Sequence, residues 1–169
     1  MCYRFRASYP KRKHDLQEQT LTPQDRAKKC ADLMYAQDAT TQGLKMAIEH
    51  VDVGTATMSM DVQPHMLNGH GICHGGYIFT LADSAFAFAC NTYNQLTVAQ
   101  QNQITYVQAG KLGERLIATA NETSKTGRSS TYDVVVTGEA GRTVALFHGL
   151  SRTIKGHHFP EPADSNGDI

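Results

Sequence analysis

An apolar run at residues 77–90, YIFTLADSAFAFAC, contains a single charged residue, Asp83, near its centre. The run is too long for a typical strand and rich in alanine, so it predicts a helix over residues 77–91 that is buried on nearly every side. A carboxylate in such a helix is unfavourable unless it is paired, hydrogen-bonded or neutralised. The fold must therefore bury one long helix and still accommodate its acid.

Strand patterns lie on both sides of this helix. Residues 44–52 and 55–62 alternate loosely around Val53-Gly54 and predict a hairpin. Four more strands are expected after the helix, at residues 97–106, 115–121, 130–137 and 143–154. We therefore predict an α+β fold in which an antiparallel sheet curls around the central helix. Because one sheet covers only part of a helix that is apolar all round, we also predict a homodimer.

The chain is expected to form one domain with an extension at each end. Residues 1–20 are basic and irregular and predict a flexible extension, with less support for a transit peptide or a nucleic-acid arm. A first helix follows, with Thr22 as its N-cap and Pro23 at its first position. The domain spans residues 21–155. The polar tail at residues 156–169 carries prolines and is predicted to be disordered.

Composition argues against several classes of protein. The 169 residues include 16 Lys and Arg against 16 Asp and Glu, so no global field favours nucleic acid or an anionic membrane surface. No apolar run approaches the roughly 20 residues needed to span a bilayer, and the N-terminal residues lack an apolar signal core. The four cysteines form no CxxC pair, which indicates a reducing, cytoplasmic compartment.

The surroundings of Asp83 point to chemistry. At helical spacing Phe79 and Ala87 lie on its face, and Phe86 lies next to it. An apolar environment raises the pKa of a carboxylate and strengthens it as a base or nucleophile. The alternative is a structural acid that is bonded to a backbone amide or to Ser84.

A Gly-Gly pair precedes the predicted helix. Gly75 and Gly76 lack side chains, so a ligand can approach their backbone N–H groups, which lie where a helix start leaves amides unpaired. This pattern predicts an oxyanion hole, although a tight turn would use the same residues. Asp83 lies about 12 Å further along the helix axis, too far for both groups of one chain to act on one carbonyl carbon. We therefore predict that the amide of one subunit faces the carboxylate of its partner.

Other reactive residues crowd the loop before the helix. His65, His70, Cys73 and His74 invite a zinc site, but their spacing is irregular and no second cluster follows, so we predict no metal. A Cys73–His74 nucleophile pair is also disfavoured, because neighbours in an extended loop tend to point apart and a base should approach in space.

The segment NGHGICHGG at residues 68–76, followed by LAD at 81–83 and AFA at 85–87, resembles the hotdog-fold acyl-CoA thioesterases. Within that family the pattern is most similar to the phenylacetate-pathway (PaaI-type) subgroup. The family pattern is Asn, a short spacer containing Gly, His-Gly-Gly, and then an Asp on the central helix. It matches over residues 68–91, and the order of elements agrees from about 44 to 154.

The resemblance implies a sheet wrapped around a central helix, a homodimer that is commonly assembled into a homotetramer, and active sites at the dimer interface. By position, Gly75 would give its N–H to the thioester carbonyl. Asp83 of the facing chain would be the base or nucleophile. Asn68 would orient the water or the carbonyl, and His74 would shape or support the loop.

The resemblance specifies the CoA-binding residues less well than the catalytic residues. Gly76 belongs to the same loop, while Lys125 and Arg128 flank a hairpin glycine and either face solvent or pair with the phosphates of CoA. Relatives usually show a basic residue and Pro after the third strand, whereas this chain has Gln108-Ala109-Gly110. This departure argues against the CoA contacts that relatives make from that turn.

The leading hypothesis is a thioesterase that hydrolyses acyl-CoA, with phenylacetyl-CoA and hydroxyphenylacetyl-CoA as candidate substrates. No cofactor is expected, because coenzyme A is part of the substrate. Asp83 either activates water or attacks the thioester to give a mixed anhydride. The alternatives are a non-catalytic acyl-CoA-binding module, which would not need Asp83, and a hotdog dehydratase of hydroxyacyl thioesters, which would use His74 with an acidic partner.

Overall fold

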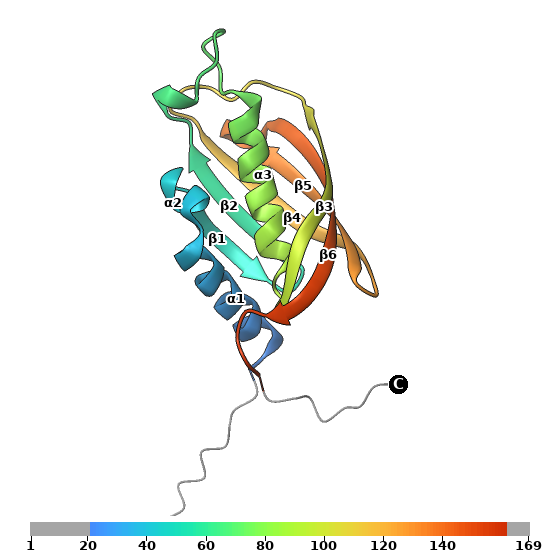
Figure 1. Ribbon diagram of the computed structural model, residues 1–169. Helices are drawn as coiled ribbons and strands as arrows, with labels where there is room; N and C mark the ends of the chain where they lie inside the picture. Colours follow the sequence, from blue (N-terminus) through green and yellow to red (C-terminus); the bar gives the residue numbers. More distant parts are fainter. Residues whose placement is uncertain (1–20, 162–169) are drawn as a thin grey trace, which may run out of the picture.

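A computed structural model of the chain describes residues 21–161 (Figure 1). The extension predicted for residues 1–20 and the last part of the tail, residues 162–169, lie outside the described residues. Across the described range, no helix combines the length and the apolar character needed to cross a bilayer.

The elements follow the predicted order, with one short helix and two 3-10 turns in addition. The helices are α1 (Pro23–Gln37), α2 (Ala39–Gly43) and α3 (Gly75–Cys90), and the turns are η1 (Pro64–Met66) and η2 (Glu139–Gly141). The strands are β1 (Ala47–Asp52), β2 (Thr55–Asp61), β3 (Gln95–Tyr106), β4 (Arg115–Thr126), β5 (Ser129–Thr137) and β6 (Thr143–His157).

The six strands form one antiparallel sheet in the order β1-β2-β4-β5-β6-β3, and this sheet wraps around α3 (Figure 1). The predicted α+β architecture is therefore confirmed. Strands β4 and β6 extend further than predicted, to Thr126 and His157. Strand β3 forms one edge of the sheet, and α1 packs beside β1 at the other edge.

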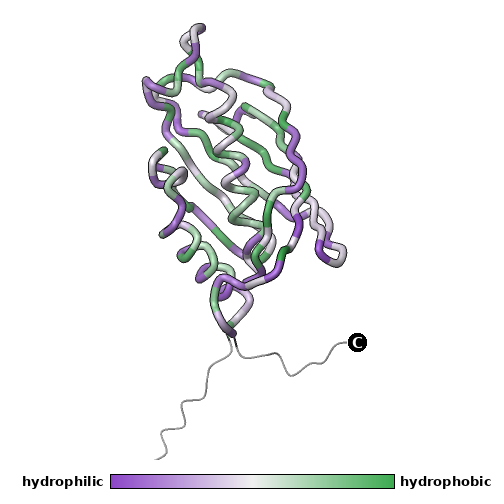
Figure 2. The backbone as a smooth tube through the Cα atoms, viewed as in Figure 1, coloured by the Kyte–Doolittle hydropathy of each residue, from purple (hydrophilic) through white to green (hydrophobic). Residues whose placement is uncertain are grey.

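The core lies between α3 and the sheet. Leu81 and Phe86 of α3 belong to one buried cluster with residues of β2 and β5 such as Met58 and Val134. Apolar residues gather along α3 and the strands that it covers (Figure 2). Gly149 on β6 leaves room for this packing, because a Cβ atom there would come within 2.8 Å of the Phe86 ring. These contacts explain why the apolar run forms a buried helix.

One strip of α3 stays partly exposed in the single chain. Gly76, Thr80, Asp83 and Ala87 follow helical spacing along this strip, and none of the four is fully buried. The prediction of a helix buried on nearly every side therefore holds for the other faces and not for this one. Asp83 lies in the strip where a carboxylate is least unfavourable.

Residues 156–161 pack against the domain, in contrast to the disordered tail predicted from residue 156. Asn94 Nδ2 donates to the Phe159 carbonyl at 2.9 Å, and the Phe159 N–H donates to Asn94 Oδ1 at 3.1 Å. Arg26 of α1 forms an ion pair with Glu161 at 2.9 Å. Phe159 is only 7% exposed. The polar composition predicted disorder because it does not reveal partners that lie far away in the sequence.

Candidate active site

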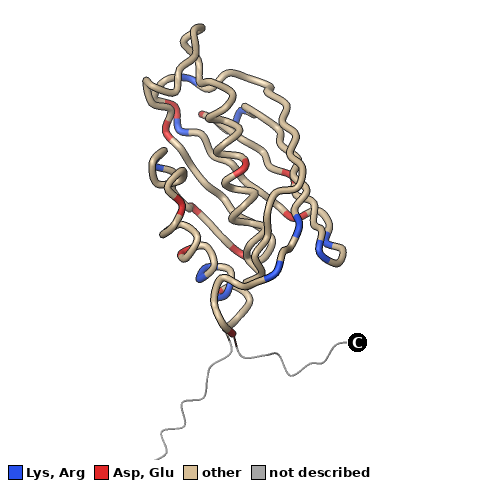
Figure 3. The backbone as a smooth tube through the Cα atoms, in the orientation of Figure 1, with Lys and Arg blue, Asp and Glu red and all other residues tan. Residues whose placement is uncertain are grey.

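Asp83 lies on the third turn of α3 and has one hydrogen-bond partner among the described residues. Asn102 Nδ2 of β3 donates to Asp83 Oδ1 at 2.6 Å. Burial raises the pKa of the Asp83 carboxyl above its ordinary value, and the bond from Asn102 offsets part of this effect. The acidic position on α3 lies among uncharged parts of the chain (Figure 3). The structural alternative, an acid bonded to a backbone amide or to Ser84, is not what the structure shows.

Sequence reasoning missed Asn102. Strand alternation places Asn102, Ile104 and Tyr106 on the same face, and the register shifts between Ala99 and Gln101 where a bulge interrupts the pairing with β6. The sequence offered one signal for Asn102, which is a polar residue on the strand face that also carries Ile104. The pairing with Asp83, 19 residues away in the sequence, could not be read from that signal alone.

The start of α3 leaves one backbone amide unpaired. The helix begins at Gly75, two residues before the predicted start, and His74 is its N-cap. The Gly76 N–H donates to His74 Nδ1 at 2.9 Å. Among the described residues, the Gly75 N–H has no acceptor. The amide that sequence reasoning assigned to the oxyanion is thus the free one, whereas that of Gly76 is already occupied.

Tyr106 lies against Gly75, and this contact was also missed. The Tyr106 hydroxyl donates to the Gly75 carbonyl at 2.9 Å. A Cβ atom at Gly75 would lie 2.8 Å from Tyr106 Cζ. Only glycine therefore allows the tyrosine to sit in this place.

Asn68 organises the loop that leads into the helix. Its Oδ1 accepts from the N–H groups of His70 at 2.9 Å and Ile72 at 3.4 Å, and its own N–H donates to the Ile72 carbonyl. No acceptor for its Nδ2 is found among the described residues. A pocket of about 410 Å³ lies beside this loop. It is lined by Asn68, Ile72, Cys73, Gly75, Ile78, Tyr106, Val107, Gln108 and Ala109.

The structure brings Asn68, His74 and Gly75 together and leaves Asp83 apart from them. Asp83 does not line the pocket that contains Gly75, and the eight-residue separation along α3 corresponds to about 12 Å of helix rise. Asp83 and the Gly75 pocket therefore do not meet within one chain. A facing subunit that supplies the second part stays a prediction.

Lys125 and Arg128 lie at the opposite end of the sheet from Gly75, in the β4–β5 hairpin (Figure 1). The Lys125 ammonium lies 3.0 Å from the centroid of the Tyr93 ring, just beyond the C-terminal end of α3. Burial lowers the pKa of Lys125. Arg128 is exposed. Within one chain these two residues do not join the Gly75 pocket.

The crowded loop shows neither a metal centre nor an activated thiol. Within residues 21–161, no three His, Cys, Asp or Glu side chains cluster closely enough to hold a metal ion. Cys73 is buried, and this burial raises the pKa of its thiol to about 11. His74 uses Nδ1 to cap α3 and not to activate the neighbouring thiol. A Cys73–His74 nucleophile is therefore not supported.

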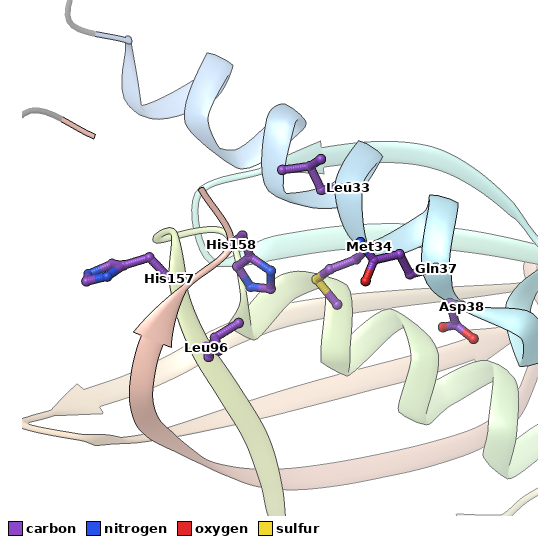
Figure 4. A pocket seen from close by; sticks show the side chains of 7 residues that line it. All are labelled: Leu33, Met34, Gln37, Asp38, Leu96, His157 and His158. Carbon is purple, nitrogen blue, oxygen red and sulfur yellow. The ribbon is translucent and has the colours of Figure 1, made fainter. Parts of the chain in front are cut away.

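A second pocket, of about 430 Å³, lies between α1 and the ends of β3 and β6 (Figure 4). It is lined by Leu33, Met34, Gln37, Asp38, Leu96, His157 and His158. Asp38 accepts from the amides of Thr40 and Thr41, and His158 is bonded to Asn91. Because these polar groups already have partners within the chain, this pocket is a weaker candidate for catalysis.

Comparisons with known proteins place the chain in a family. The family model described as "Thioesterase superfamily" matches residues 70–145. The chain is 40% identical over 126 residues to the acyl-coenzyme A thioesterase PaaI of Escherichia coli K12, covering 75% of this chain and 90% of that protein. The solved structure of the E. coli PaaI protein from the phenylacetic acid degradation operon matches with a TM-score of 0.79 and 38% identity, over 80% of this chain and 99% of that one.

A more distant solved structure shares the fold. The protein smu.793 of Streptococcus mutans, bound to acetyl CoA, matches with a TM-score of 0.64 and 26% identity, over 66% of this chain and 90% of that chain. Together with the PaaI structure, this match confirms the hotdog fold that the motif implied.

Proposed function

The chain belongs to the thioesterase superfamily and is a thioester hydrolase, and we propose that it converts acyl-CoA and water to the free acid and coenzyme A. The observation that carries this proposal is the pairing on one helix of two unusual groups. Asp83 is a half-buried acid with a raised pKa, and Gly75 begins the same helix with a free amide. Asp83 is proposed as base or nucleophile and Gly75 as oxyanion donor.

A second copy of the chain is proposed to complete the site. Three features support a homodimer: the partly exposed strip of α3 that contains Asp83, the edge position of β3, and the separation of Asp83 from the Gly75 pocket. An unpaired strand edge is a common surface for association. The homotetramer is proposed from the resemblance alone.

The proposed chemistry uses the Gly75 amide and the Asp83 carboxylate together. As a nucleophile adds to the thioester carbon, the carbonyl oxygen becomes negative and accepts a hydrogen bond from the Gly75 N–H at the positive end of α3. The raised pKa of Asp83 makes its carboxylate a stronger base near neutral pH. Collapse of the tetrahedral intermediate breaks the C–S bond and releases the CoA thiolate, which takes up a proton to become the thiol.

The remaining site residues are proposed to support these two groups. His74 caps α3 and so holds Gly75 in place, and Asn68 braces the loop while its Nδ2 is free to meet the substrate carbonyl or a water. Gly76 contributes space and not a hydrogen bond, because its amide is occupied. Lys125 and Arg128 are kept as candidate contacts for the CoA phosphates across subunits.

The proposed acyl groups are phenylacetyl and hydroxyphenylacetyl. The pocket beside Gly75 is lined by Ile72, Ile78 and the Tyr106 ring, which suits an aryl or medium aliphatic group. The match to PaaI supports the same class. No cofactor is proposed, because the substrate itself carries coenzyme A, and the free thiols of Cys30, Cys73 and Cys90 agree with the proposed cytoplasmic location.

Thiol release from a panel of acyl-CoA substrates, read with a thiol reagent, tests the function. The wild-type protein should release CoA, fastest from aryl-acetyl thioesters, and Asp83→Asn should abolish turnover without changing the fold or the dimer. Asp133→Asn, at an exposed acid of β5, is the matched control and should keep full activity. Binding without thiol release would favour a non-catalytic module, and water loss from hydroxyacyl-CoA would favour a dehydratase.

Mixing two inactive variants tests the shared site. If Asp83→Asn subunits are exchanged with Gly75→Ala subunits, each mixed dimer regains one site made of the intact amide of one chain and the intact acid of the other. Statistical mixing then restores about a quarter of the wild-type sites, because half the dimers are mixed. Activity that stays at the level of the separate variants would mean that both groups act within one chain.

A further inference from the structure

Tyr106 occupies the place where Gly75 would carry a side chain. A Cβ atom on Gly75 would lie 2.8 Å from Tyr106 Cζ and 2.9 Å from its hydroxyl oxygen. The ring therefore fills the space beside the glycine Cα atom, and the hydroxyl donates to the Gly75 carbonyl at 2.9 Å. Burial raises the pKa of the Tyr106 hydroxyl above its ordinary value of 10. The hydroxyl thus stays protonated, and remains a donor, at neutral and mildly alkaline pH.

The peptide group that follows the free amide is held at both ends. Its carbonyl, that of Gly75, accepts from Tyr106. Its N–H, that of Gly76, donates to His74 Nδ1 at 2.9 Å. Because a peptide group is planar and rigid, bonds at its two ends fix its plane. The preceding peptide group carries the free Gly75 N–H, and its carbonyl, that of His74, accepts from the Tyr77 N–H at 3.0 Å.

A glycine in this position needs a restraint from outside the helix. With no Cβ atom, glycine has more backbone freedom than any other residue. An oxyanion donor, in contrast, acts best when its direction is fixed before the reaction starts. His74 restrains Gly75 from within the loop and helix start, whereas Tyr106 belongs to β3 and restrains it from the sheet. The ring and hydroxyl of Tyr106 therefore replace the restraint that the glycine lacks.

We infer that Tyr106 is a positioning residue that orients the oxyanion amide of Gly75 through the adjoining peptide group. The inference rests on the proposed role of Gly75. Because the Tyr106 hydroxyl donates its hydrogen to a backbone carbonyl, it acts on the direction of the amide and not on the substrate. The amide matters most when the thioester oxygen becomes negative in the transition state, so loss of the hydroxyl should lower kcat and leave KM nearly unchanged.

The test removes the hydroxyl and keeps the ring, because the ring also lines the pocket beside Gly75. In a thiol-release assay, Tyr106→Phe should lower kcat about 3- to 10-fold, the range of an ordinary hydrogen bond, with KM close to wild type. Its affinity for a CoA thioether, which has no carbonyl oxygen, should stay the same.

Tyr35→Phe is the matched control. The Tyr35 hydroxyl also donates to a backbone carbonyl, that of Met46, at 3.0 Å, and Tyr35 does not line the Gly75 pocket. The two variants therefore lose the same atom and the same kind of bond. Tyr35→Phe should keep the kcat of wild type, even where urea unfolding shows that both variants lose similar stability.

A double variant tests whether the hydroxyl acts through Gly75. In the Gly75→Ala background the amide is already displaced, so adding Tyr106→Phe should lower kcat no further. NMR relaxation of the Gly75 amide nitrogen gives a direct measure of its order. The Gly75 amide should be less ordered in Tyr106→Phe than in wild type or in Tyr35→Phe.

Four results would overturn the inference. They are an unchanged kcat in Tyr106→Phe, an equal fall of kcat in Tyr35→Phe, losses that multiply in the double variant, and weaker binding of the thioether, which would place the hydroxyl on the substrate. In each case the wild-type protein still releases thiol, so the proposed function stands. If the wild-type protein releases no thiol from any acyl-CoA, the proposed function fails first and the inference falls with it.

Discussion

The two ends of α3 differ in how completely the polar groups near them are hydrogen-bonded. At the C-terminal end, Asn91 is saturated: Nδ2 donates to the carbonyls of Ala87 at 2.9 Å and Thr97 at 3.0 Å, and Oδ1 accepts from the Thr97 N–H at 2.9 Å and from His158 Nε2 at 2.8 Å. From the N-terminal end to the helix middle, the Gly75 amide and Asn102 Oδ1 lack partners among the described residues. The polar groups at the C-terminal end are thus paired within the chain, whereas the Gly75 amide, which is proposed to meet the substrate, has no partner among the described residues.

The saturated end also joins three distant parts of the chain. Asn94 binds the backbone of Phe159, and Glu161 accepts from both Asn94 and Arg26. Helix α1, the α3–β3 turn and the end of β6 are therefore held together there. This difference predicts that substitutions near the start of α3 change turnover, while substitutions at its far end change stability.

The largest effect on turnover is expected at the N-terminal end of α3, where the Gly75 amide has no partner among the described residues. Gly75→Ala places a Cβ atom 2.8 Å from Tyr106 Cζ, so the tyrosine or the amide must move, and kcat should fall about 100- to 1000-fold, as when an oxyanion donor is lost. Tyr106 is 50% exposed and can swing outward, so the unfolding midpoint should change little. Steady-state thiol release and urea unfolding measure the two quantities.

Gly69→Ala, in the loop that precedes α3, is the control for the general effect of replacing a glycine by alanine. A Cβ atom at Gly69 meets nothing within 4 Å, and its φ is not positive. This variant should keep wild-type activity. Equal losses in both variants would trace the effect to the mobility of the loop and would argue against a specific amide.

At the C-terminal end of α3, where Asn91 is fully hydrogen-bonded, we expect a loss of stability without a loss of turnover. Asn91 is 3% exposed, and Asn91→Ala leaves two carbonyls, one amide and one imidazole without their partner, which should lower the free energy of unfolding by about 2–4 kcal/mol. The kcat of the folded fraction should stay the same. Asn121→Ala, at an exposed asparagine of β4, should change stability by less than about 0.5 kcal/mol. A fall in kcat for Asn91→Ala equal to that of Gly75→Ala would remove the proposed division between the two ends.

The smallest effect is a pH dependence of stability at His158. Burial, and then the charge of His157, lowers the pKa of His158 below its ordinary value of 6.5. The unfolded chain therefore takes up the proton first, so stability is full above about pH 6.5 and declines as the pH falls toward the lowered pKa. Urea unfolding between pH 5 and 8 should show this decline in wild type and a smaller one in His158→Gln. An identical slope in both proteins would exclude His158 as its source.

The sequence predicted what depends on local pattern. The length and alanine content of the apolar run predicted α3, strand patterns predicted the six strands, and a single acid in that run identified Asp83. The missed residues Asn102, Tyr106 and Asn91 act through partners that strand pairing and chain reversal bring close, and no local pattern encodes those contacts. The tail was misjudged for the same reason, because its partners lie in α1 and in the turn after α3.

Strand β3 runs alongside α3 and contacts it at two points, Asn102 with Asp83 and Tyr106 with Gly75. Four strand residues advance about 13 Å and eight helical residues about 12 Å, so the two contacts form rungs of a ladder with matched spacing. A slip of β3 along the helix would break both rungs together. The partner of the acid and the cover of the helix start are therefore tied to one register, and inserting a single residue between Asn102 and Tyr106 would allow only one of the two contacts to form at a time.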